Sequence, residues 1–174
     1  MINIKTPREI ELMRVAGEIV GDTHKYLIPY LKPGITTKEI DSLARDYIIK
    51  KGATPSCYNY NGYPGNICIS INEEVVHGIS GNRKLCDGDI VTLDICACYK
   101  GYHGDSAWSY PIGNISEEKK YLLTRYFASK IIFSNRIFRF LASQFQYFFM
   151  YFFHSFVSIF FTFIINDHKV SSTS

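Results

Sequence analysis

Two aspartates in the middle of the sequence stand where a carboxylate is costly to bury. Asp94 lies inside the apolar run Ile90–Ile95, and Asp105 lies in the next stretch expected to form a strand. A buried carboxylate needs a cation or hydrogen-bond donors. If a tight hairpin places Cys98 opposite Gly101, Asp94 falls directly opposite Asp105, with both side chains on one face. Two carboxylates this close repel each other, so they either share a proton or bind a metal ion.

Carboxylate oxygens suit hard or borderline divalent ions, and two such ions can share bridging carboxylates. The alternative interpretation is structural: one aspartate caps a turn and the other forms a surface ion pair. A shift of the hairpin register by one residue would also place Asp94 and Asp105 on opposite faces of the sheet. From spacing alone, both interpretations stay open.

A histidine and four sulfur-bearing or aromatic residues form a second group of candidates. His77 follows two valines and precedes Gly78, and there it could donate to a substrate carbonyl or relay a proton near neutral pH. It could equally be a half-buried structural histidine. The candidate wall of an apolar pocket consists of Cys57, Tyr60, Tyr63 and Cys68. Such residues tolerate a sulfur-containing ligand, although they could also be ordinary core.

Helix-capping motifs and hydrophobic periodicity predict the helices and strands that carry these residues. Thr6 and Glu9 form one capping box and Thr36 and Glu39 a second, so two helices are expected. The first helix is expected to bury Ile10, Met13, Gly17, Val20, His24 and Leu27. Strands are expected at 67–71, 90–95 and 103–110, and a third helix at 117–124. Two helices followed by antiparallel strands predict an α+β fold, an antiparallel sheet with covering helices.

The composition changes abruptly towards the C-terminus. All thirteen phenylalanines lie between Phe127 and Phe163, whereas all twelve glycines lie at or before Gly113. We therefore expect two segments, residues 1–124 and residues 125–174. Residues 145–165 carry no charge and are long enough to span a bilayer as a helix. The alternative origin is AT-rich DNA translated out of frame or read through, and we favour it because the change begins inside an expected helix.

Charge and cysteine content exclude other classes of protein. The net charge of +3 is spread along the chain, so there is no nucleic-acid footprint. The five cysteines include no C-x-x-C pair, which argues against a zinc or redox motif. The N-terminus shows no secretory signal. We expect a cytoplasmic protein, with membrane association only if residues 145–165 insert.

Over about residues 1–124 the sequence resembles the type I methionine aminopeptidases. The resemblance rests on eight short segments: 5–7, 13–17, 32–34, 60–64, 69–73, 76–79, 87–94 and 102–105. It implies the N-terminal half of a pita-bread (creatinase/aminopeptidase) fold. It also implies a hydrolase that removes the initiator methionine from the N-termini of nascent polypeptides, with the ribosome as the place where it would meet them.

The resemblance assigns roles to the candidate residues. Asp94 would chelate one of two divalent metal ions and Asp105 would bridge both, with Co, Mn, Fe or Zn all compatible. His77 would bind substrate near the scissile amide and stabilise the tetrahedral intermediate. The methionine side chain would be held by Cys57, Tyr60, Tyr63 and Cys68.

The chain also departs from the family's pattern. The family's other metal ligands, one histidine and two glutamates, belong to a second half that has no match here, and no glutamate follows Glu118. We therefore expect this chain alone to bind metal weakly and to have little activity. The alternatives are a pita-bread binding module without catalysis and a tail-anchored membrane remnant.

Overall fold

The computed structural model describes residues 4–125. The helical elements are α1 (Pro7–Leu27), η1 (Ile28–Tyr30), α2 (Thr37–Lys50) and η2 (Tyr60–Gly62), and the strands are β1 (Thr54–Pro55), β2 (Cys68–Ile71), β3 (Ile90–Tyr99) and β4 (Tyr102–Pro111). A further helix runs from residue 117 to the end of the described part, as predicted. Residues 4–123 form one compact unit. The predictions for residues 126–174, including the segment 145–165, lie outside the described residues.

Both main helices begin at the predicted capping boxes. The backbone N–H of Thr6 donates to Oε2 of Glu9 (2.7 Å), and the N–H of Glu9 donates back to Oγ1 of Thr6 (3.3 Å). Thr36 and Glu39 make the same pair of bonds at 2.8 and 3.2 Å. These reciprocal bonds satisfy N–H groups that the first helical turn leaves without partners. The sequence therefore predicted both helix starts correctly.

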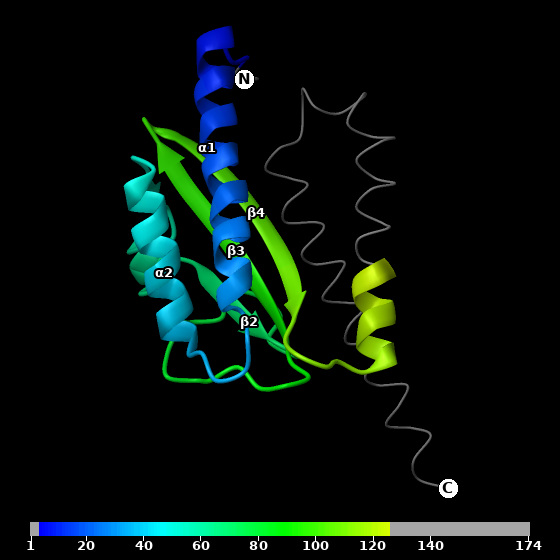
Figure 1. Cartoon of the computed structure of the whole chain (residues 1–174). Coiled ribbons are helices and arrows are strands. Elements are labelled where there is room, and N and C mark those ends of the chain that lie inside the picture. Colours follow the sequence, from blue (N-terminus) through cyan, green and yellow to red (C-terminus); the bar gives the residue numbers. More distant parts are fainter. Residues whose placement is uncertain (1–3, 126–174) are drawn as a thin grey trace, which may run out of the picture. The chain divides into compact units, whose positions relative to one another are not determined.

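The apolar face of α1 is shorter than predicted. Ile10 is 56 % exposed, and Gly17 is also exposed. Figure 1 shows that the first turns of α1 extend past the end of the sheet. The buried residues of the helix are Ala16, Ile19, Val20, Thr23, His24 and Leu27. The periodicity was right for the second half of the helix and wrong for the first.

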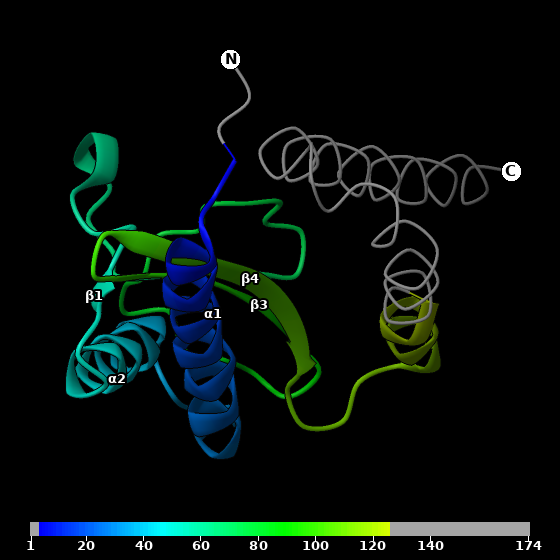
Figure 2. The same cartoon turned by 90° about the horizontal axis from the view of Figure 1, so that it is seen from above.

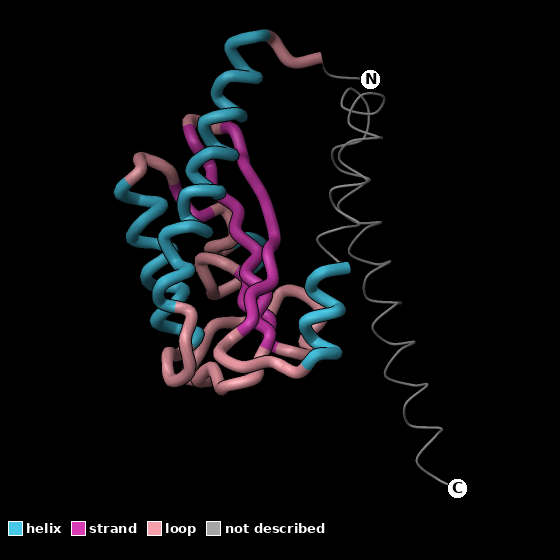
Figure 3. Tube along the Cα trace, turned by 45° about the vertical axis from the view of Figure 1, so that its right-hand side comes forward, coloured by secondary structure: helices cyan, strands magenta, loops and turns pink. Residues whose placement is uncertain are grey.

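The sheet has four antiparallel strands, and both helices cover the same face of it (Figure 2). β3 is central: β1 and β2 pair with its two ends on one side, and β4 pairs along its whole length on the other. The β3–β4 hairpin is the longest feature of the sheet (Figure 3). Alternate residues of a strand point to opposite faces. Each strand of the hairpin therefore has a helix face and an open face.

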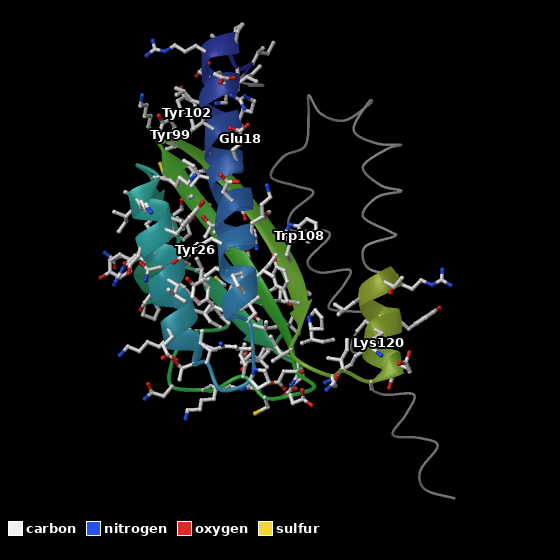
Figure 4. All side chains as sticks on the ribbon, viewed as in Figure 1. Glu18, Tyr26, Tyr99, Tyr102, Trp108 and Lys120 are labelled. Atoms are coloured by element: carbon white, nitrogen blue, oxygen red, sulfur yellow. The ribbon has the colours of Figure 1, made fainter. Side chains whose placement is uncertain are left out.

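The register of this hairpin differs from the predicted one. Tyr99 pairs with Tyr102, so the two-residue turn consists of Lys100 and Gly101, which both have positive φ (49° and 85°). Tyr99 and Tyr102 flank that turn at the end of the hairpin (Figure 4). A tight turn with positive φ at both central residues matches the right-handed twist of the paired strands. The predicted turn was displaced by one position, and the strand pairing by two.

The core lies between the helix face of the sheet and the two helices. Its central members are Ile19, Val20, Leu27, Ile40, Ala44, Ile48, Val91, Leu93, Ile95 and Ala97. Gly104 lets α1 approach the sheet closely, because a Cβ there would lie 2.5 Å from backbone atoms of Ala16 and Gly17. This contact fixes the height of α1 above the hairpin. Within residues 4–125, no helix is both long and apolar enough to cross a membrane.

Candidate functional site

The open face of the sheet carries three of the predicted site residues, Cys68, Asp94 and Asp105. Cys68 pairs with Asp94, and Cys96 pairs with Asp105, so the four side chains share one face. Asp94 does not lie opposite Asp105 as predicted, because its partner is Ala107. The shift of two residues keeps both aspartates on the same face, and they become diagonal neighbours. The prediction was therefore wrong in register and right about the shared face.

The two carboxylates interact strongly. Burial of the carboxyl group, the charge of Asp94 and a hydrogen bond with Asp94 raise the pKa of Asp105 to about 7. Because the residue as a whole is exposed, solvent screens part of this repulsion. No ion pair within residues 4–125 involves either aspartate. This part of the chain thus leaves two adjacent carboxylates without a cation to balance them.

Three of the four predicted pocket residues lie together beside Asp94. The thiols of Cys57 and Cys68 are hydrogen-bonded to each other, and this bond together with burial raises the pKa of Cys57. Burial raises the pKa of Tyr63, whose hydroxyl also contacts Cys68. Cys68 is buried although it faces away from the helices, because the loop carrying Cys57 and Tyr63 covers it. The same hydrogen bond from Cys57 lowers the pKa of Cys68.

Tyr60 is not part of this group. It lies in η2 and is 71 % exposed. The loop places Tyr63 inward and Tyr60 outward, because the backbone reverses between them, with positive φ at Asn61 and Gly62. The role of Tyr60 in a pocket stays a prediction.

Cys96 extends the polar face from Asp105 towards β1. Burial and the charges of Asp105 and Asp94 raise the pKa of Cys96 to about 11, so its thiol stays protonated. Ser56 and His103 are hydrogen-bonded here through Oγ and Nδ1 at 2.9 Å. Neither Cys96 nor His103 was predicted as a site residue. Their positions follow from the strand register, which the sequence alone did not fix.

His77 lies in the loop between β2 and β3, exposed to solvent and with a φ of 55°. The next residue, Gly78, is bonded to β2: the N–H of Ile69 donates to its carbonyl (2.9 Å), and its own N–H donates to Oγ of Ser70 (3.2 Å). The loop therefore fixes the backbone next to His77 against the strand that carries Cys68. The histidine side chain is available for contact with a ligand.

Sequence reasoning missed Asp41, a carboxylate on α2 that is only 6 % exposed. It accepts hydrogen bonds from the backbone N–H groups of Asn66 (2.8 Å) and Ile67 (3.1 Å) and from the Asn66 side chain. These bonds hold the loop that leads into β2. An aspartate among the polar residues of an amphipathic helix gives no sign of this role, because its donors lie 25 and 26 residues further along the chain.

The residues of the open face suit a divalent cation. Asp94 and Asp105 offer oxygen ligands whose repulsion a cation would relieve. Within residues 4–125, however, no three histidine, cysteine, aspartate or glutamate side chains are grouped so that they could hold a metal ion together. The described part of the chain therefore offers two carboxylates that could act as ligands, and tight binding of a metal ion would need others.

Comparison with known proteins assigns the chain to a family and its fold to a class. The model of metallopeptidase family M24 matches residues 11–130, and the chain belongs to this family. Methionine aminopeptidase 1 of Bacillus subtilis is 58 % identical over 123 residues, which cover 71 % of this chain and 50 % of that protein. The predicted relationship to methionine aminopeptidases is thus confirmed.

Solved structures agree with this assignment. The methionine aminopeptidase from Rickettsia prowazekii is similar with a TM-score of 0.73 and 33 % identity, covering 75 % of this chain and 53 % of that one. The enzyme from Thermotoga maritima gives a TM-score of 0.70 and 38 % identity, with the same coverage. The predicted α+β half of a pita-bread fold is confirmed. The chain spans about half the length of the curated relatives it matches.

Proposed function

We propose that this protein takes part in the metal-dependent removal of methionine from the N-termini of newly made polypeptides. The observation that carries the proposal is the adjacency of two groups on one face of the sheet. A pair of uncompensated carboxylates, Asp94 and Asp105, lies next to a thiol-lined group, Cys57 and Cys68. That arrangement offers a cation site beside a wall for an apolar, sulfur-containing side chain.

Each residue has a role that follows from its chemistry. Asp94 and Asp105 would hold divalent metal, which when bound would polarise the scissile carbonyl and activate water. Cys57, Cys68 and the ring of Tyr63 would contact the methionine side chain, because thiols and aromatic rings pack well against a thioether. His77 would donate a hydrogen bond near the scissile amide.

The small number of metal ligands limits how tightly this chain could bind metal by itself. Two carboxylates bind a divalent ion weakly, so a complete site needs further ligands. We infer that a complete site holds two metal ions. The two aspartates do not decide whether these ions are Co, Mn, Fe or Zn.

The natural substrates would be nascent chains at the ribosome in the cytoplasm. All five cysteines are free thiols in the structure, which suits a reducing compartment.

The proposal is tested with the full chain and the tripeptides Met-Ala-Ser and Lys-Ala-Ser. Binding is followed by saturation-transfer NMR and methionine release by chromatography, with each of the four metals in turn. We expect metal-dependent binding that prefers Met-Ala-Ser, and at most trace release. The Asp105→Asn variant should lose the metal dependence, whereas Asp46→Asn, at an exposed carboxylate on α2, should keep it. Equal binding of the two peptides, or binding that ignores metal, would contradict the proposal.

A further inference from the structure

The carbonyl of Gly78 receives two hydrogen bonds from different elements. One comes from the backbone N–H of Ile69 in β2 (2.9 Å) and the other from the hydroxyl of Tyr63 (2.7 Å). The N–H of the same glycine donates to Oγ of Ser70. Both polar backbone groups of Gly78 are therefore paired, and one of the partners is a side chain of the candidate pocket.

Only glycine fits at position 78. A Cβ there would collide with the backbone carbonyl of Ile69 and lie 3.0 Å from Cα of Ser70. The loop thus rests directly on β2, without a side chain between them. His77, one residue earlier, has a left-handed backbone, which a non-glycine residue keeps only where the surroundings hold it. The position of His77 depends on the bonds made by its neighbour.

Tyr63 is itself held on two sides. Its ring packs on Gly65, where a Cβ would lie 3.0 Å from Cε1 of the tyrosine. Its hydroxyl lies within reach of the Ile67 carbonyl (3.3 Å) as well as that of Gly78, and it contacts the thiol of Cys68. A single side chain therefore connects the pocket wall to the loop that carries His77.

We propose that Tyr63 is a positioning residue whose hydroxyl, through the Gly78 carbonyl, sets the place of His77 relative to the pocket formed with Cys57 and Cys68. The importance of that placement for substrate rests on the proposed function. The placement itself is a property of the free protein. A ligand that displaces the Tyr63 ring would move His77, so pocket occupancy and the position of the histidine are coupled.

The test is amide hydrogen exchange by NMR on the full, metal-free chain. Tyr63→Phe keeps the ring and removes the hydroxyl. It should speed exchange at the amides of Ile69 and Gly78 roughly 2- to 10-fold, which is the effect of losing one ordinary hydrogen bond. The amide of Asn66, which is bonded to Asp41 and not to Tyr63, is an internal reference and should not change. Tyr58→Phe, at a tyrosine that is 63 % exposed, is the matched control.

Unchanged exchange at Ile69 and Gly78 in Tyr63→Phe would overturn the proposal, and so would equal acceleration at Asn66, because that would show general loosening. A second measurement needs no variant. The Tyr63 hydroxyl proton, held between two carbonyls, should exchange slowly enough to be observed in the unsubstituted chain, and rapid exchange would also overturn the proposal.

Addition of L-methionine separates this inference from the proposed function. In the unsubstituted chain it should shift the ring signals of Tyr63 and His77 together, and in Tyr63→Phe the His77 shift should shrink at least about 2-fold. If Tyr63→Phe loosens the loop but L-methionine shifts neither ring, the positioning role stands and the methionine pocket fails. If L-methionine shifts His77 equally in both proteins, the positioning role fails and the pocket stands.

Discussion

The two faces of the β3–β4 hairpin differ in character: one is buried and closely packed, and the other carries two carboxylates. On the helix face, Leu93 is fully buried, and Gly104 leaves no room for a side chain beneath α1. On the open face, Asp94 and Asp105 repel each other, and the described residues supply no cation. Each residue on one face is the sequence neighbour of a residue on the other. Adjacent positions therefore differ in character: one packs into the core, and the next carries a charge that the described residues leave unbalanced.

The largest expected difference in stability is between substitutions at two neighbouring residues of β3, Leu93 and Asp94. Leu93→Ala should lower the free energy of unfolding by about 3 kcal/mol, because it leaves a cavity in the core. Asp94→Ala should change it by no more than about 0.5 kcal/mol, or raise it, because it removes a repulsive charge. Urea unfolding of the full metal-free chain measures both. Equal losses at the two positions would mean that the two faces are not built differently.

A smaller loss is expected where α1 meets the hairpin. Gly104→Ala should cost about 2 kcal/mol, because the new methyl group meets backbone atoms of Ala16 and Gly17, which cannot move aside. Gly17→Ala is the matched control on the facing helix: a Cβ there meets nothing within 4 Å. That change should stabilise the protein by about 0.5–1 kcal/mol through helix propensity. Tolerance of Gly104→Ala would show that the close approach of α1 is not required.

The smallest effect concerns pH. The pKa of Asp105 is raised from 3.8 to about 7 in the folded protein. Between these values the unfolded chain loses its proton while the folded chain keeps it, so Asp105 destabilises the fold increasingly as pH rises from 4 to 7. Asp105→Asn should therefore be more stable than the parent at pH 8, and the difference should shrink at pH 4. Unfolding with EDTA at both pH values checks this; a pH-independent difference would contradict it.

The sequence predicted the helix starts but not the register of the hairpin. The capping boxes at Thr6 and Thr36 are local patterns of four residues, so both helix starts could be predicted. The hairpin register could not, because Tyr99, Lys100 and Gly101 allow two placements of a two-residue turn. The error of two positions preserved the faces, since side chains alternate with a period of two. That is why Asp94 and Asp105 were still correctly placed together.

Long-range contacts explain what sequence reasoning missed. Asp41 looks like a surface residue of α2 until the loop at Asn66 folds against it. Ile10 fits the apolar periodicity of α1 but is exposed in the folded protein. Cys96 and His103 join the site only through strand pairing. In each case the decisive partner is distant in the chain, and a periodic pattern carries no information about it.

The most direct test of the account is a manganese titration of the full chain, followed by calorimetry at pH 8. We predict weak binding of Mn²⁺ that is lost in both Asp94→Asn and Asp105→Asn and retained in Asp46→Asn. Binding should also weaken at pH 6, because the metal must then displace the proton of Asp105. If both Asp94→Asn and Asp105→Asn bind manganese as well as the parent does, the open face of the hairpin is not a metal site, and the proposed chemistry loses its basis.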